Sequence, residues 1–238
     1  MAIMIDQAKD FRELDASLKQ IDTTVPRRVD GRNRPTRTTE VWTICHLLAA
    51  LAESKDLKYP ISLLRSEKPD FQLHDGDGTT GIEVTEATTE QYSAYSSAVE
   101  KAGTGFLEPA HFRYSAPDLS SRQMDNLLRE TELSSDGWSG DSPEREWAQG
   151  IQSSIEKKLL TINIPGYQKF KKNWLAIYDN LPLPSINVGK AVSYLQPRLN
   201  VTWAQSPCFN VVFVETGSII VRLTATSAEQ LPLIHGYQ

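Results

Sequence analysis

The stretch from Lys68 to Ala87, KPDFQLHDGDGTTGIEVTEA, constrains the fold more than any other part of the chain. Two short runs within it, Asp70–Leu73 and Gly81–Thr85, have the composition of strands. Between them lies HDGDGTT, a segment rich in Gly and Asp of the kind that joins antiparallel strands. The stretch therefore predicts a β-hairpin.

The predicted hairpin brings two acidic residues together. Because side chains alternate along a strand, Glu83 and Thr85 lie on one face. Asp70 begins the opposite strand, so its carboxylate can approach Glu83. A pair of carboxylates supplies hard oxygen ligands, which suit Mg²⁺ or Mn²⁺ better than Zn²⁺. The alternative is that Asp70 only starts a turn and that Glu83 is a solvated residue on the strand.

These residues resemble the motif of the PD-(D/E)XK nuclease superfamily, which has the restriction-endonuclease-like fold. Pro69 and Asp70 are followed by twelve residues, then Glu83, one spacer and a polar residue. The resemblance implies that Asp70 and Glu83 hold a divalent metal ion. It also implies a lysine two residues after the second acid that helps to activate water. Thr85 stands at that position, so the chain departs from the family pattern there.

Composition sets limits on the partners and the compartment. The 238 residues suffice for one large domain with an appended arm, and 39% hydrophobic content permits a packed core. The net charge of −5 gives no overall basic surface, so nucleic-acid binding requires a local patch. Cys45 and Cys208 have no metal-ligand spacing and indicate reduced thiols. Without a signal-like N-terminus or a membrane-length apolar run, a soluble cytoplasmic protein is expected.

The first 37 residues predict a helix followed by a basic loop. Apolar residues recur at helical spacing over residues 5–20, and we expect this amphipathic helix to pack beside the domain. The segment PRRVDGRNRPTR then carries five arginines against one aspartate, and Pro and Gly exclude regular structure from it. We expect Arg32, Arg34 and Arg37 to contact phosphates of nucleic acid. A solvated linker explains the same charges.

A helix is predicted over residues 40–53, with Thr38 or Thr39 as its N-cap. Glu40 falls in the apolar stripe of this helix, which requires an explanation. Favourable interaction with the helix dipole is one, since Glu40 lies in the first turn. The resemblance supplies the other, because the first core helix of these nucleases often carries a Glu that joins the metal site. His46 points away from the stripe and is expected at the surface.

The remaining elements follow in an order that resembles the superfamily core: helix, three strands, helix, strand. A strand over 59–65 precedes the hairpin, and helices are predicted over 88–101 and 144–162, followed by a buried strand over 174–178. A loop-rich insertion, about 102–143, separates the two helices, with a short helical piece near 121–132. Its residues 111, 113 and 114 (His, Arg, Tyr) either contact nucleic acid or pack as an aromatic loop. A helix near 188–199 and a hairpin over 209–224 complete the chain.

The helix over 144–162 offers a replacement for the missing lysine. Its apolar residues form one arc at about 100° per residue; Lys158 falls inside this arc and Lys157 outside it. Some branches of the superfamily carry the lysine on this helix, so the resemblance makes Lys158 the catalytic candidate. The alternative is a lysine whose stem covers apolar surface while its amine reaches water.

Together these features predict one α/β domain over 38–238, with a mixed central sheet flanked by helices, and an N-terminal helical arm over 1–37. The predicted function is a metal-dependent phosphodiesterase that uses Mg²⁺ or Mn²⁺, with DNA favoured over RNA as substrate. Asp70, Glu83, Thr85 and Lys158 are the predicted catalytic residues, and Glu40 is a third candidate metal ligand. The alternative is a catalytically inactive module of the same fold that binds nucleic acid or a protein. The oligomeric state stays open, with a homodimer among the alternatives, and no motif supports an unrelated hydrolase.

Overall fold

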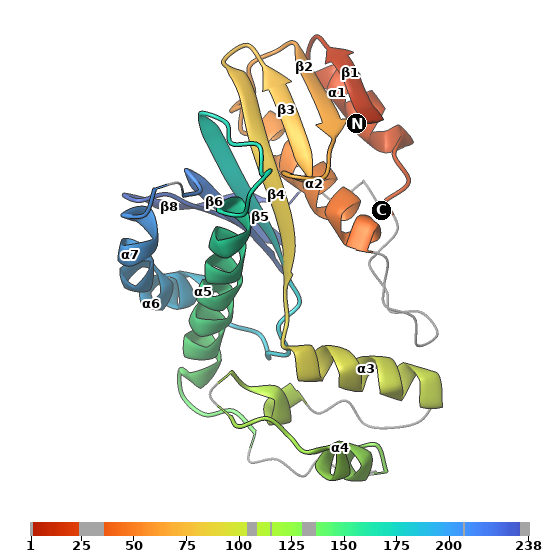
Figure 1. Ribbon diagram of the computed structural model, residues 1–238, viewed down its shortest axis with the longest axis vertical. Helices are drawn as coiled ribbons and strands as arrows, with labels where there is room; N and C mark the ends of the chain where they lie inside the picture. Colours follow the sequence, from red (N-terminus) through yellow and green to blue (C-terminus); the bar gives the residue numbers. More distant parts are fainter. Residues whose placement is uncertain are drawn as a thin grey trace.

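The computed structural model describes residues 2–23, 36–103, 109–114, 116–129, 137–206 and 208–233. Within these residues the chain forms an eight-stranded mixed sheet flanked by helices, an α/β architecture (Figure 1). The strands lie side by side in chain order. They are β1 (Ala2–Ala8), β2 (Ile61–Arg65), β3 (Phe71–Asp75), β4 (Gly78–Ala87), β5 (Lys172–Asp179), β6 (Val211–Thr216), β7 (Ile219–Leu223) and β8 (Ala228–Pro232).

Strands β4, β5 and β6 are parallel, and every other neighbouring pair is antiparallel. Glu83 of β4 stands opposite Leu175 of β5, which in turn stands opposite Val212 of β6. Parallel neighbours need long crossovers, and helices supply them here. The carboxyl ends of the three central strands therefore meet at one edge of the sheet.

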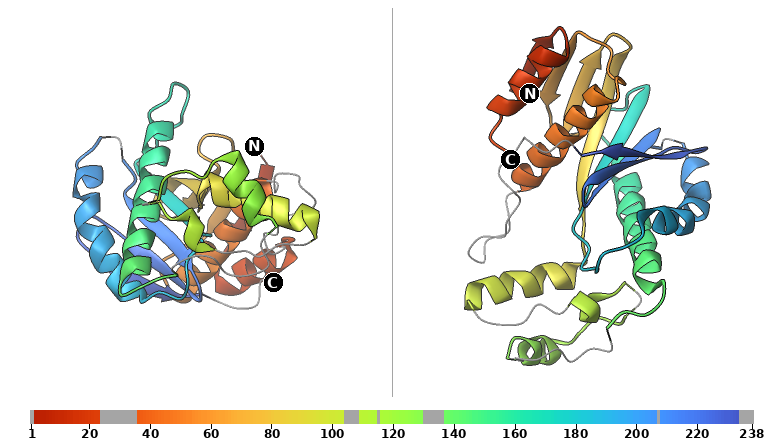
Figure 2. Two further views of the ribbon diagram at one scale, coloured as in Figure 1. Left: turned by 90° about the horizontal axis from the view of Figure 1, so that it is seen from below. Right: turned by 180° about the vertical axis from the view of Figure 1, so that it is seen from behind.

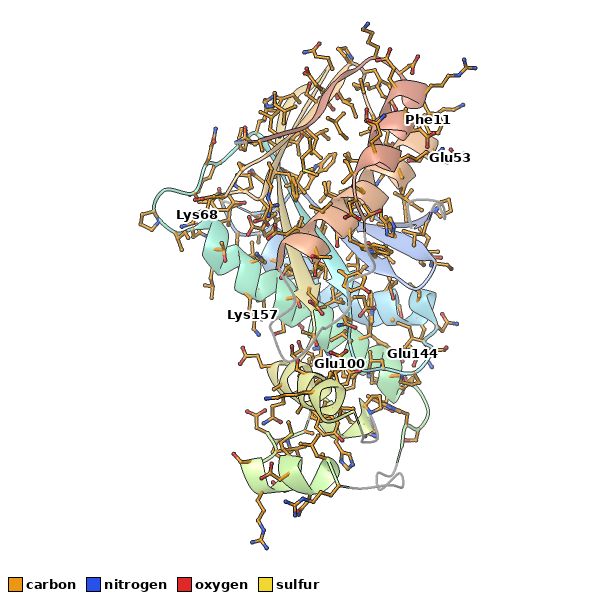
Figure 3. The ribbon with its side chains drawn as sticks, turned by 90° about the vertical axis from the view of Figure 1, so that its right-hand side faces the viewer. Phe11, Glu53, Lys68, Glu100, Glu144 and Lys157 are labelled. Carbon is orange, nitrogen blue, oxygen red and sulfur yellow. The ribbon has the colours of Figure 1, made fainter. Side chains whose placement is uncertain are left out.

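Helices cover both faces of the sheet. They are α1 (Phe11–Gln20), α2 (Thr36–Glu53), α3 (Glu90–Ala102), α4 (Ser121–Leu127), α5 (Ser142–Ile162), α6 (Val188–Leu195) and α7 (Asn200–Trp203), with 3-10 turns η1 (Pro109–Phe112) and η2 (Gln196–Leu199). Helices α1 and α2 pack on one face, and α5 and α6 pack on the other. Figure 3 shows α2 and α5 on opposite sides of β4. No described helix is both long and apolar enough to cross a membrane.

Two apolar cores, one on each face, follow from the alternation of side chains along the strands. Ile82 and Val84 of β4 belong to the core beneath α2, whereas Ala87 belongs to the core beneath α5. The arc predicted on α5 is confirmed, because its members are all buried: Trp147, Ile151, Ile155, Leu159 and Ile162. Glu83 alternates with Ile82 and Val84, so its side chain lies on the α5 side.

A small lobe is inserted between β4 and α5, formed by α3, η1 and α4. It has its own core around Tyr95, Phe112 and Leu127. Figures 1 and 2 show the lobe beyond the carboxyl end of β4, apart from the rest of the molecule. The hydroxyl of Tyr114 donates a hydrogen bond of 3.2 Å to the carbonyl of Thr88 and ties the lobe to the end of the strand.

The N-terminal segment differs from the helix predicted over 5–20. Residues 2–8 form the edge strand β1, which pairs with β2, and α1 begins only at Phe11. The register shifts between Ile5 and Ala8, so both of these residues are buried on the same side of the sheet although they are three apart. A bulge thus reproduces the spacing of a helix. Residues 2–8 therefore belong to the sheet, and only residues 11–20 form the predicted helix, which packs on the sheet.

His46 is not a surface residue, contrary to the prediction. Its side chain is 3% exposed, and its Nδ1 lies 2.7 Å from Oε1 of Glu215. The indole of Trp42 donates to the same oxygen at 2.9 Å. Helix α2 is buried continuously from Trp42 to Ala52, because the sheet and α1 cover it together. One apolar stripe therefore does not describe its buried surface.

Candidate functional site

Asp70 lies at the start of β3, where the neighbouring strand fixes its carboxylate. Oδ2 accepts a hydrogen bond of 2.8 Å from the backbone N–H of Val84. Burial and then the negative charge of Glu83 raise the pKa of Asp70 to about 7; the Val84 hydrogen bond and the charge of Lys158 act in the opposite direction. Asp70 therefore shares an electrostatic environment with both other principal candidates.

Glu83 is 3% exposed and is held by two donors. Lys158 Nζ donates to Oε1 at 2.7 Å, and the hydroxyl of Tyr167 donates to Oε2 at 3.1 Å. A buried carboxylate needs such partners, because desolvation of an unpaired charge is costly. The structure thus brings Asp70, Glu83 and Lys158 together at the junction of β3, β4 and α5.

Lys157 and Lys158 differ as the geometry of an α-helix predicts. The Lys158 side chain is 23% exposed and points toward the sheet. The Lys157 side chain is 64% exposed, and its Nζ lies 4.0 Å from Glu90; Figure 3 shows it near the surface of α5. One step of about 100° along the helix accounts for the difference.

Tyr167 is a site residue that the sequence analysis missed. It lies between α5 and β5 and is 8% exposed. Burial, followed by the charge of Glu83, raises its pKa, so the phenol stays protonated and acts as a donor. The Pro165-Gly166 turn after α5 is the one signal in the sequence, because it reverses the chain just before this aromatic residue.

Glu40 lies close to the site but has its own partner. Its Oε2 accepts a hydrogen bond of 2.7 Å from Arg65, and both side chains are largely buried. The negative charge of Glu40 contributes to the raised pKa of Asp70. Arg65, a second residue that the sequence analysis missed, thus balances a nearby acid. Thr85 is partly buried and lies two residues beyond Glu83 on β4.

The predicted nucleic-acid contacts stay predictions. Arg32 and Arg34 lie outside the described residues. The backbone of Arg37 belongs to α2, which begins at Thr36 rather than after Thr38. The basic segment is therefore shorter at its C-terminal end than the predicted loop.

The carboxylates can be tested for their fit to a hard cation. Among the described residues, no group of three or more His, Cys, Asp and Glu is arranged to hold a metal ion. Mg²⁺ often needs only one or two carboxylates, since water completes its octahedral shell. Oδ1 of Asp70 has no hydrogen-bond partner within the described part of the chain, and repulsion from Glu83 raises the pKa of Asp70. A cation between the two acids would relieve that repulsion, so the pair fits Mg²⁺ or Mn²⁺.

An open hollow of about 640 Å³ is lined by sequence neighbours of the candidate residues. Its lining includes Lys68 and Gln72, which flank Asp70 in sequence, and Gln168, which follows Tyr167. The amide of Gln72 donates to that of Gln168 at 3.3 Å and links the two sides. Arg65, which is paired with Glu40, and the acidic Glu67 also line the hollow.

The chain matches no protein-family model, no curated protein and no solved structure. Its own residues therefore carry the evidence for its function.

Proposed function

We propose that this protein is a metal-dependent phosphodiesterase, an endonuclease that acts on DNA. The observation that carries the proposal is the contact of Lys158 Nζ with Glu83 Oε1 at 2.7 Å, beside Asp70. A lysine from a distant helix thereby supplies the positive charge that Thr85 cannot supply. The order of α2, β2, β3, β4, α5 and β5, interrupted after β4 by the lobe with α3, η1 and α4, supports a restriction-endonuclease-like core.

Asp70 and Glu83 would hold Mg²⁺ or Mn²⁺, with Glu40 adding negative charge nearby. Such an ion, when bound, lowers the pKa of a coordinated water and offsets negative charge on the phosphoryl group. Because the pKa of Asp70 is raised, a proton and a metal ion compete for its carboxylate.

The side chains of this chain have separable roles in the proposal. Lys158 positions the attacking water or stabilises charge on the phosphoryl oxygens. Tyr167 orients Glu83 through its hydrogen bond to Oε2. Thr85 can hold a water molecule through its hydroxyl group. Arg65 and Lys68 place positive charge along the hollow, where a substrate backbone would pass.

A second candidate function is an inactive module of the same fold that binds nucleic acid or a protein. One observation favours it: both oxygens of Glu83 are already engaged, by Lys158 and Tyr167, as in a structural ion pair. The raised pKa of Asp70 argues against the inactive module, because it shows that the ionised form is disfavoured beside Glu83. A module without a metal site gains nothing from two acids placed so close together.

Metal binding separates the two candidates. A ligand that binds only the native state raises the melting temperature. We expect Mg²⁺ or Mn²⁺ to raise it in the wild type and to have no such effect in Asp70→Asn, which keeps the shape of the side chain. An equal rise in both proteins would place the metal elsewhere. The absence of any rise, together with the absence of cleavage, would favour the inactive module.

A further inference from the structure

A second pocket lies where the lobe meets the sheet and α5. It has a volume of about 250 Å³ and is lined by residues 88–91, 111–114, 116–118 and Lys157. We call it the lobe pocket. None of the roles assigned to Asp70, Glu83 and Lys158 uses it.

Two elements, β4 and α5, carry both candidate catalytic residues and residues that line the lobe pocket. Lys157 immediately precedes Lys158 on α5, and Thr88 follows Thr85 by three residues at the end of β4. At about 3.3 Å per residue, Thr88 stands roughly 10 Å beyond Thr85. A polymer bound at the catalytic residues can therefore extend into the pocket, whereas a small substrate cannot span both.

Arg113 and Thr88 bring hydrogen-bond donors to the wall of the pocket. Arg113 donates to the carbonyl of Gly137 and lies over the ring of Trp138 at 4.4 Å, so its guanidinium group is held in place. Its Nε and the hydroxyl of Thr88 are buried and have no hydrogen-bond partner among the residues that the structure describes. Arg113 and Thr88 thus keep donors at this wall of the pocket for which the described residues supply no acceptor.

Further donors come from the start of α3 and from Lys157. Thr89 caps the helix by accepting from the N–H of Tyr92, and the amides of Glu90 and Gln91 precede the first bonds within the helix. Lys157 adds an accessible positive charge at the rim. These groups suit an oxyanion.

Two carboxylates also line the pocket and limit the charge of its ligand. The Glu90 side chain is 94% exposed and lies 4.0 Å from Lys157, and Asp118 is exposed as well. Repulsion from these acids disfavours a dianion such as inorganic phosphate, whereas a phosphodiester carries a single charge. The balance of charges therefore matches a phosphate within a nucleic-acid backbone.

We propose that the lobe pocket binds one backbone phosphate of the nucleic-acid substrate, close to the bond that is cleaved. The proposal rests on the nuclease function and assigns the lobe a part in it. Lys157 and Arg113 contact this backbone phosphate, whereas Lys158 acts at the phosphate that is cleaved.

The test is a set of binding measurements in EDTA, where no cleavage interferes. Fluorescent DNA duplexes carry a single uncharged methylphosphonate that is moved along the backbone. In the wild type, we expect one position near the cleavage site to weaken binding several-fold. In Lys157→Gln, the same substitution should have little further effect, and the salt slope of duplex binding should fall by about 0.9.

Lys101→Gln is the matched control, because Lys101 is an exposed lysine at the opposite end of α3. This variant should retain the wild-type profile. Arg113→Lys serves as a second variant that keeps the charge but loses the geometry of the guanidinium group. Since Lys157 is exposed, its replacement does not endanger the fold.

The outcomes separate the pocket from the nuclease function. If DNA is bound and cleaved but no phosphate position depends on Lys157 or Arg113, the pocket assignment is wrong and the nuclease proposal stands. If the protein binds no DNA at all, both proposals fail.

Discussion

Glu83 is held by two side chains that lie far from it in the sequence, Lys158 and Tyr167. Asp70, by contrast, accepts one hydrogen bond and is left with a raised pKa. The two acids thus have different surroundings before any metal ion binds. Glu83 is compensated by protein donors, and Asp70 is the position at which a proton or a cation gains most.

The raised pKa of Asp70 predicts how stability depends on pH. A carboxyl with a higher pKa in the folded protein binds its proton more tightly there, so stability falls as pH rises from about 4 to about 7. Asp70→Asn should remove on the order of 4 kcal/mol of this decrease. Urea unfolding of the metal-free wild type and of metal-free Asp70→Asn at several pH values measures this decrease in stability. The neighbouring charges of Glu83, Lys158 and Glu40 are present in both proteins. Parallel pH profiles for variant and wild type would show that Asp70 does not titrate in this range.

Lys158 and Lys157 predict different kinetic defects. Lys158→Ala should lower kcat by at least about 100-fold, the scale found when a preorganised charge is removed from a transition state. Lys157→Ala should leave kcat nearly unchanged and weaken substrate binding, as the lobe pocket requires. Loss of Lys158 also leaves Glu83 with one donor, so rates are compared well below the melting temperature of each variant. Equal losses of kcat would favour a Lys158 that serves only as a structural partner of Glu83.

Tyr167 is a positioning residue in this account. Tyr167→Phe removes the donor to Oε2 of Glu83 and keeps the buried ring. We expect the dissociation constant for Mn²⁺ to rise about 10- to 100-fold, as is usual when a group that orients a metal ligand is lost. Calorimetric titration measures this without reference to catalysis. A purely structural tyrosine would lower the melting temperature and leave metal affinity as it was.

At the scale of elements, the predictable parts of the site are those set by local spacing. The hairpin of β3 and β4, the alternation around Glu83 and the arc of α5 all follow from residues close together in sequence. The position of Lys158 follows from the same helical geometry. The roles of these residues in catalysis are not settled by their positions and stay predictions.

The parts that failed depend on contacts between distant segments. A bulge gave β1 the spacing of a helix, so Ile5 and Ala8 were assigned to the wrong kind of element. His46 is buried in contact with Glu215, 169 residues away, and its ring nitrogen shares a hydrogen bond with that side chain. Strand β8 and the Arg65 partner of Glu40 likewise have no local signal. Pairings of this kind become visible only once the sheet is assembled.

The basic segment that ends in the first turn of α2 carries its own prediction. Replacing Arg32, Arg34 and Arg37 by glutamine should weaken DNA binding and reduce its salt dependence, because each phosphate contact releases counterions. Fluorescence anisotropy at several salt concentrations measures both quantities. If affinity and salt slope equal those of the wild type, the segment is a linker.

At the scale of the whole molecule, one sheet separates two apolar cores. Polar residues lie where β4 extends beyond these cores. The strand carries Glu83 between α5 and Asp70 and then continues into the lobe. Catalytic candidates and lobe pocket therefore lie along the same two elements, β4 and α5. The proposed nuclease function requires a substrate long enough to reach both.

The most direct test of this account is cleavage of plasmid DNA and of a structured RNA, with Mg²⁺, Mn²⁺ or EDTA, by the wild type and by Glu83→Ala. The variants Glu83→Gln and Asp70→Ala are assayed in parallel, and circular dichroism checks that each variant is folded. The account predicts cleavage of DNA that requires the metal ion and disappears in each folded variant. Undiminished cleavage by a folded Glu83 or Asp70 variant would contradict the proposed site. Failure of the wild type to cleave either polymer under any of these conditions would contradict the nuclease function itself.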